Sequence, residues 1–288
     1  MSVILALLSA FAYGAADYMG GIASRRARVL AVVVISQLVG LAILLVLLRV
    51  LPPAFPTRTD IMFGAFAGVT GAFGIAFLYR GLSRGRMSVV SPITAVVAAI
   101  APVVFGLSTG ERPSALALAG VVIALVAITL VTSSPGHDEH GSPLSFAGPW
   151  WREPGVLDAF ISGLAIGGFY IFIARTSPAS GLWPLVPSRI VSSAICLAAA
   201  LSLRHSLRPV PGSLRLILAS GVVDVTANAL YLEATRFGYL SLVAVLASLY
   251  PASTVLLARV LLKERFTPAQ MAGMACAVAG IACIATGR

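Results

Sequence analysis

The sequence contains few charged residues for a chain of 288. Asp, Glu, Lys and Arg together make up 10% of it, hydrophobic residues make up 59%, and the mean hydropathy is +0.98. Soluble globular domains carry roughly 25% charged residues. A chain with so little charge has too few polar groups to cover a surface in water, so the composition predicts an integral membrane protein.

Cysteine is also scarce, and the motifs of several enzyme classes are missing. The three cysteines, Cys196, Cys276 and Cys283, lie in apolar segments without a CxxC pair, which argues against a disulfide framework or a zinc site. No G-x-x-x-x-G-K-[ST] motif occurs, so ATP hydrolysis is not the expected energy source. HDEH at 137–140 lacks the spacing of a strong metal site and reads as a solvated loop. We therefore expect no enzymatic activity, no metal and no other cofactor.

Long apolar segments fill most of the chain. A helix needs about 20 apolar residues to cross the hydrocarbon core of a bilayer, and ten segments reach this length. The first segment lacks a basic n-region and is longer than the apolar region of a signal peptide, so we expect it to be retained. The expected spanning helices are 2–22, 29–50, 61–82, 86–108, 115–133, 156–175, 182–203, 214–235, 240–262 and 267–286.

The two halves of the chain repeat each other. ERPSALALAG at 111–120 matches ERFTPAQMAG at 264–273 with an offset of 153 residues, and the same offset places Gly68 on Gly221. A five-helix unit ends on the opposite side of the membrane from its start, so the second unit must enter inverted. Inverted repeats are typical of alternating-access transporters, whose site lies where the repeats meet. We divide the chain into a first repeat at 1–134, a polar linker loop at 135–153 and a second repeat at 154–288.

The doubled Glu-Arg…Ala-Gly sequence, the ten helices and a proline in each fourth helix resemble the drug/metabolite transporter (DMT) superfamily, EamA type. The prolines, Pro102 and Pro251, stand at different distances from Glu111 and Glu264, so we do not treat them as equivalent. The resemblance implies a secondary transporter of a small organic metabolite in the inner (plasma) membrane, with export as the expected direction. It does not name the substrate, because members move amino acids, other metabolites, sugars or drugs.

The distribution of basic residues conflicts with the orientation that this resemblance implies. Cytoplasmic loops are usually rich in Lys and Arg, and the formal charge of +10 comes mostly from loops and helix ends. The charge count favours both termini outside, whereas the resemblance implies both termini inside, so the orientation stays open. We attribute the positive charge to topology and to contact with anionic headgroups, and we expect no nucleic-acid partner.

Three ionisable residues, Asp17, Arg189 and Asp224, lie deep in the expected helices. An ionised group at mid-bilayer costs about 2.5–3.5 kcal/mol on insertion scales, so it usually faces a cavity or a partner. Asp17 followed by Gly20 is similar to the acidic residue and glycine in the first helix of small multidrug transporters, which implies exchange of a proton against a cation. The alternative is a buried carboxylate whose pairing holds the fold together.

Asp224 heads a polar stripe with Asn228 and Tyr231, since the three residues are spaced by four and three along one helix. This stripe predicts a surface that faces a cavity, and the alternative is hydrogen bonding between helices. Arg189 must find an anion or water because it does not lose its charge. Asp17, Asp224 or a substrate carboxylate could serve, and the related position of the first half falls near the neutral Gln37.

Aromatic and hydroxyl residues on the same helices complete the candidate site. Carboxylates favour a proton or a cation and Arg189 favours an anion, so an amino acid or related zwitterion would satisfy both. We expect a small-molecule substrate, protons as coupling ion, a lipid bilayer, and a monomer or homodimer. The alternative function is a non-transporting membrane scaffold or a channel-like protein. The further candidate residues are Tyr13, Tyr170, Thr94, Ser248 and Tyr250.

Overall fold

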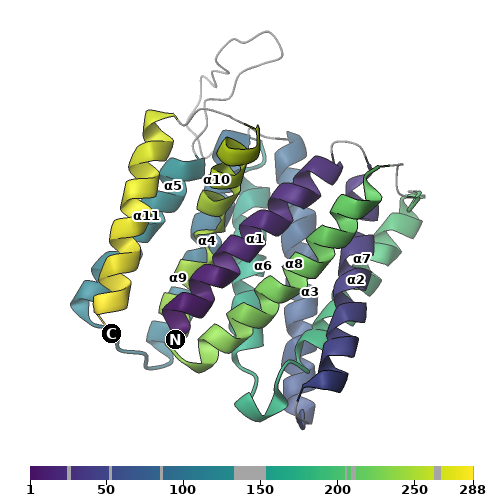
Figure 1. The fold of residues 1–288 in the computed structure, drawn as a ribbon, viewed down its shortest axis with the longest axis horizontal. Coiled ribbons are helices and arrows are strands. Elements are labelled where there is room, and N and C mark those ends of the chain that lie inside the picture. Colours follow the sequence, from purple (N-terminus) through teal and green to yellow (C-terminus); the bar gives the residue numbers. More distant parts are fainter. Residues whose placement is uncertain are drawn as a thin grey trace. The chain divides into compact units, whose positions relative to one another are not determined.

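The computed structural model describes residues 1–24, 27–51, 54–84, 87–132, 154–204, 206–208, 212–262 and 267–287. Over these residues the chain is helical and contains no strand, which confirms the predicted all-α class. The α-helices, labelled in Figure 1, are α1 (Ser2–Ser24), α2 (Val29–Val50), α3 (Arg58–Arg84), α4 (Met87–Ser108), α5 (Ala115–Thr132), α6 (Val156–Ala174), α7 (Leu185–Ser202), α8 (Leu214–Arg236), α9 (Leu240–Ala247), α10 (Tyr250–Leu262) and α11 (Pro268–Thr286). A short 3₁₀ turn, η2 (Pro178–Ser180), lies between α6 and α7.

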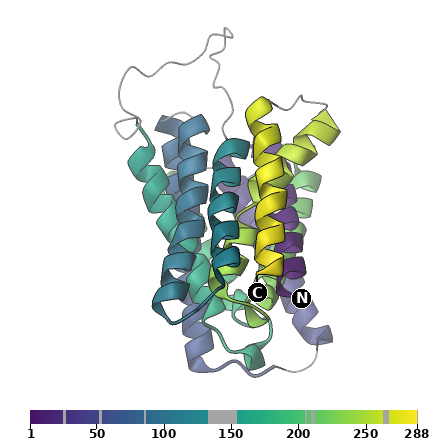
Figure 2. The ribbon, with the colours of Figure 1, turned by 90° about the vertical axis from the view of Figure 1, so that its left-hand side faces the viewer.

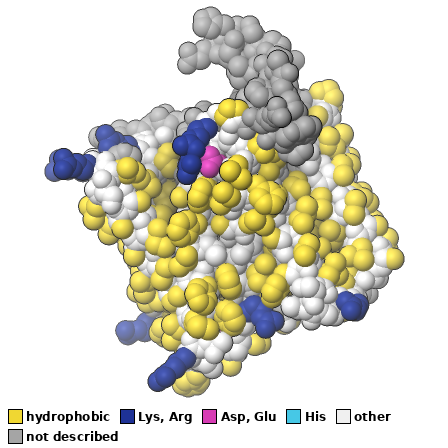
Figure 3. All heavy atoms as spheres, turned by 180° about the vertical axis from the view of Figure 1, so that it is seen from behind, with side chains coloured by type: hydrophobic (Ala, Val, Ile, Leu, Met, Phe, Trp, Pro, Cys, Tyr) yellow, Lys and Arg dark blue, Asp and Glu magenta, His cyan; other side chains and the backbone are white. Residues whose placement is uncertain are grey.

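Most of these helices are suited to a bilayer. Within the described ranges nine segments are long and apolar enough to span a membrane, one of them formed by α9 and the start of α10, and α4 adds a shorter apolar stretch at Pro92–Ser108. The face shown in Figure 3 is covered mainly by hydrophobic side chains, with arginines toward its margins. The chain is therefore a multi-pass membrane protein, as its composition predicted.

One predicted helix is interrupted. The segment expected at 240–262 ends its first part at Ala247, and α10 begins at Tyr250. Pro251 has no N–H group, so the carbonyl of Ala247 loses its usual donor four residues on. Pro92 and Pro102, in contrast, lie within the continuous α4. All eight residues of α9 are buried.

The helices form two compact units, and each unit draws on both halves of the sequence. The first unit contains Met1–Ala72 and Phe169–Gly238, and the second contains Phe73–Gly168 and Tyr239–Arg288. The chain passes from one unit to the other within α3 and again within α6. The repeat boundaries at 134 and 154 remain a prediction, and the linker with HDEH lies outside the described residues.

The first unit contains the same close helix crossing twice. A Cβ atom at Gly68 on α3 would overlap the carbonyl of Ser188 on α7, and a Cβ atom at Gly221 on α8 would overlap the carbonyl of Ser36 on α2. Gly68 and Gly221 are equivalent under the sequence offset, and Ser36 and Ser188 are equivalent after a slip of one residue. Only glycine allows backbones to approach so closely, so the internal repeat reappears as a repeated contact.

The second unit is organised around the pair α5 and α11, which lie side by side in Figure 2. A Cβ atom at Gly120 would lie 2.9 Å from both the Cβ of Cys283 and the carbonyl oxygen of Gly280. Small residues are typical of helix contacts in membranes because they allow close packing. Cys283 thus serves as a packing residue here, and all three cysteines are free.

Candidate functional site

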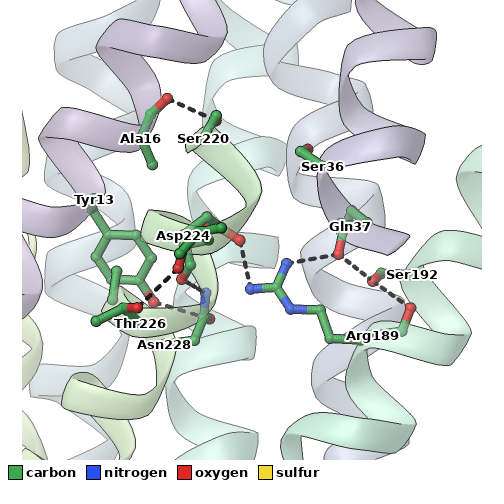
Figure 4. A network of polar contacts seen from close by, with 12 residues as sticks. Tyr13, Ala16, Ser36, Gln37, Arg189, Ser192, Ser220, Asp224, Thr226 and Asn228 are labelled. Carbon is green, nitrogen blue, oxygen red and sulfur yellow. Dashed lines mark hydrogen bonds and ion pairs between the residues drawn. The ribbon is translucent and has the colours of Figure 1, made fainter. Parts of the chain in front are cut away.

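Arg189 lies at the centre of a polar network in the first unit (Figure 4). Its Nη1 donates a hydrogen bond to Oε1 of Gln37 at 2.8 Å, and its Nη2 lies 2.5 Å from Oδ2 of Asp224. The Arg189 side chain is 8% exposed and that of Asp224 is 32% exposed. Of the expected partners of Arg189, the structure therefore brings Asp224 to it, and the two charges neutralise each other.

Gln37 was missed as a site residue by the sequence analysis. Its Oε1 accepts hydrogen bonds from both Arg189 and the hydroxyl of Ser192, the latter at 3.1 Å. Gly40, one turn further along α2, allows α8 to approach closely, because a Cβ atom there would lie 3.3 Å from both the carbonyl oxygen of Gly221 and the Cβ of Val225. The available signal was the internal repeat, which makes Gln37 equivalent to Arg189 after the same one-residue slip that relates Ser36 to Ser188. Sequence alone does not reveal that the two side chains meet.

Hydrogen bonds join residues 9–16 of α1 to residues 220–228 of α8. Asn228 is buried, and its amide nitrogen also donates to the backbone carbonyl of Asp224 at 2.7 Å. Its side chain is thus used in contacts between and within helices, which was the alternative to a cavity-lining role. The three bonds between the helices run from Ser9 Oγ to Ala227 O at 2.8 Å, from Tyr13 Oη to Asn228 Oδ1 at 3.0 Å, and from Ser220 Oγ to Ala16 O at 3.0 Å.

The candidate tyrosines of the first unit form a packed aromatic cluster. The rings of Tyr170 and Tyr231 have centroids 4.5 Å apart, and Tyr13 meets Tyr170 edge to face at 6.4 Å. The Tyr231 hydroxyl donates to the carbonyl of Tyr170 at 3.3 Å. Tyr170 and Tyr231 are buried, so they shape the interior beside the Arg189–Asp224 pair rather than present hydroxyls to solvent.

Asp17 contrasts with these satisfied groups. Its side chain lies on the exposed part of α1, and it makes no hydrogen bond or ion pair with any residue that the structure describes. A charged carboxylate is strongly disfavoured against lipid, so Asp17 requires water, a proton or a cation as its partner.

The remaining candidates belong to the second unit. Thr94 is buried and donates to the carbonyl of Ala159 at 3.2 Å. Ser248 is fully buried at the break between α9 and α10, and its hydroxyl has no hydrogen-bond partner among the described residues. Tyr250 is the first residue of α10.

Charged residues near the helix ends pair locally. Asp158 lies 3.4 Å from Arg80 and 3.5 Å from Arg84, and Glu233 lies 2.5 Å from Arg236. The described residues also contain no cluster of His, Cys, Asp or Glu able to hold a metal ion.

The glutamate of the repeated Glu-Arg sequence has a structural role in the second unit. The two carboxylate oxygens of Glu111 accept hydrogen bonds from the backbone N–H groups of Leu240 at 2.7 Å and Ser241 at 3.0 Å. Helix N-termini carry unpaired N–H groups and favour negative charge. Glu111 therefore caps α9 from the α4–α5 loop, a role that the sequence analysis did not find.

Many apolar spanning helices, a buried ion pair and an exposed intramembrane carboxylate are features of secondary transporters. The chain matches the EamA-like transporter family over residues 1–133 and 153–286. It belongs to this family, and so to the drug/metabolite transporter superfamily, with its two-repeat architecture. A solved structure titled only "Crystal structure of protein" has a TM-score of 0.75 and 17% identity, covering 98% of this chain and 96% of that one, which supports the fold. No curated protein matches the sequence.

Proposed function

We propose that this chain is a proton-coupled secondary transporter that exports a small organic metabolite across the inner membrane by alternating access. Asp17 is the carboxylate that binds the coupling proton or the cationic group of the solute. Arg189 and Asp224 form a neutral pair beside it. Family membership supports transport of a small molecule, whereas the substrate, the direction and the coupling are our proposal.

The observation that carries this proposal is the difference between the two aspartates. Asp224 has Arg189 as a counter-ion at 2.5 Å, whereas Asp17 is exposed and has no such partner among the described residues. An unpaired intramembrane carboxylate is suited to bind and release a cation or a proton, because ligand binding removes the unfavourable charge.

The charges of Asp17, Arg189 and Asp224 also favour a solute that carries a positive group. One carboxylate remains without a counter-ion after Arg189 and Asp224 have paired, so the solute should carry an amine or another positive group. An amino acid or related zwitterion fits, provided that its own carboxylate is held by neutral donors or displaces Asp224 from Arg189.

The first experiment is a thermal-shift screen of the purified protein against amino acids, amines and carboxylates at an acidic and an alkaline pH. A ligand that binds the folded state raises the apparent Tm by mass action. We expect amine-containing hits whose effect grows with pH, as Asp17 becomes ionised. Asp17→Asn should abolish the shift, and Asp17→Glu should keep part of it.

Transport in proteoliposomes then separates the rival functions. A saturable, counterflow-competent flux that is lost in Asp17→Asn supports the proposal, and Glu233→Gln is a matched control because Glu233 pairs with Arg236. Flux without saturation or counterflow would indicate a channel. No flux of any solute that shifts Tm, with folded protein in the membrane, would favour a scaffold.

A further inference from the structure

Gln37 gives the Arg189 guanidinium a second contact besides its ion pair with Asp224. A guanidinium group carries donors along several edges, and here two of its nitrogens are used by different helices: Nη2 by Asp224 on α8 and Nη1 by Gln37 on α2. Figure 4 shows Arg189 lying between these two residues. Both contacts therefore determine the orientation of the Arg189 guanidinium.

The orientation of the Gln37 amide follows from its neighbours. Its oxygen faces two donors, Arg189 Nη1 and Ser192 Oγ, so the amide group presents its acceptor to the guanidinium and not its NH₂. As a neutral acceptor it holds Arg189 without adding a second negative charge. The Arg189–Asp224 pair thus keeps a net charge of zero.

We infer that Gln37 is a positioning residue that commits Arg189 to Asp224 and so keeps Asp17 without a counter-ion. Ala16, next to Asp17 on α1, accepts a hydrogen bond from Ser220, which lies one turn before Asp224 on α8, so a guanidinium released from α2 would be shared between the two carboxylates. The inference rests on the proposed function, in which Asp17 is the working carboxylate.

The test uses the labelling of carboxyl groups in the full-length protein. Carbodiimides react with protonated carboxyl groups in apolar surroundings, and peptide mass spectrometry reports labelling of Asp17 and Asp224 separately as a function of pH. In the wild type we expect Asp17 to be labelled and Asp224 to be protected by Arg189. Gln37→Met, which keeps the chain length but removes the acceptor, should shift the midpoint of Asp17 labelling to lower pH and increase labelling of Asp224.

A neighbouring substitution provides the control. Ser36 lies beside Gln37 on α2, and its hydroxyl bonds only to the carbonyl of Val33 in the same helix, so Ser36→Ala should leave both labelling profiles unchanged. If Gln37→Met also leaves both profiles unchanged, the inference is wrong.

A second test moves the negative charge from position 224 to position 37. Asp224→Asn should lower Tm because Arg189 loses its counter-ion, and Gln37→Glu in the same chain should restore most of that loss by placing a carboxylate on the other edge of the guanidinium. A double variant no more stable than Asp224→Asn would overturn the inference. Failure of the proposed function would give a different result. Transport that survives Asp17→Asn would refute Asp17 as the working carboxylate, whereas the labelling profiles of the wild type and of Gln37→Met would still test the role of Gln37.

Discussion

The two units of this transporter hold their main helix pairs together by different means. In the first unit, α1 and α8 are joined by side-chain hydrogen bonds and lie beside the Arg189–Asp224 ion pair. In the second unit, α5 and α11 meet through glycine backbones, and a polar contact near the helix ends is the bond from Ser114 Oγ to the carbonyl of Gly287. Both pairs pack closely, but α5 and α11 contain no charged residue in their sequences, whereas α1 carries Asp17 and α8 carries Asp224.

This difference between the two helix pairs indicates which of them is needed for stability alone. Close packing of small residues is sufficient to join helices in a bilayer, as α5 and α11 show. Buried polar groups are costly unless they are satisfied, so the polar content of the first unit is not needed merely to hold a helix pair. We interpret the second pair as scaffold and the first as the working region, and substitutions in each should therefore behave differently.

The largest effect is expected from breaking the ion pair of the first unit. Asp224→Asn leaves the 8%-exposed Arg189 without a counter-ion, and loss of one member of a buried pair costs about 3–5 kcal/mol. The double substitution Arg189→Met/Asp224→Leu should recover most of this loss. Denaturant unfolding of the purified protein measures both, and equal instability of the single and double variants would contradict this account.

The next effect is expected from the glycine contact of the second unit. Gly120→Ala places a methyl group 2.9 Å from Cys283 Cβ, and such overpacking costs about 1–3 kcal/mol. Gly21→Ala on α1 is the matched control, since nothing lies within 4 Å of its Cβ position, and it should stabilise the helix by up to about 1 kcal/mol. Similar unfolding free energies for the two variants would show that α5 and α11 do not depend on this contact.

A smaller effect is expected at the cap of α9. Glu111→Gln removes the charge and leaves one acceptor for the N–H groups of Leu240 and Ser241, which should cost about 1–2 kcal/mol. Hydrogen exchange at these two amides should accelerate, while amides in α11 should not change. Unchanged exchange at Leu240 and Ser241 would refute the capping role.

The smallest effect is expected at Tyr13. Tyr13→Phe removes the hydrogen bond to Asn228, and such contacts between membrane helices average about 0.6 kcal/mol. Thr226→Val is the control, because Thr226 bonds only to the carbonyl of Val222 in its own helix. A loss above about 2 kcal/mol for Tyr13→Phe would mean that the aromatic cluster depends on the hydroxyl more than its geometry suggests.

Much of the fold was predictable because it follows from local sequence. Apolar length alone located the spanning helices, and the recurrence of Glu111 at Glu264 revealed the repeat. The break at Ser248–Leu249 was only partly predictable. Pro251 removes a backbone hydrogen bond of the helix, but Pro92 and Pro102 also lack an N–H group and lie in a continuous helix. Whether a proline interrupts a helix depends on the neighbours that surround it.

The site was less predictable for the same reason. Asp17, Arg189 and Asp224 stand out in the sequence because charge is rare in apolar helices, which requires no knowledge of contacts. Their pairing, the role of Gln37 and the cap made by Glu111 depend on side chains far apart in the chain. The sequence by itself determined a membrane protein with repeated halves and three charged residues inside apolar helices, because the length and composition of each segment decide whether it lies in lipid or in water. Only the tertiary structure decided that Arg189 neutralises Asp224 and leaves Asp17 unpaired, because that choice depends on distances of a few ångströms between different helices.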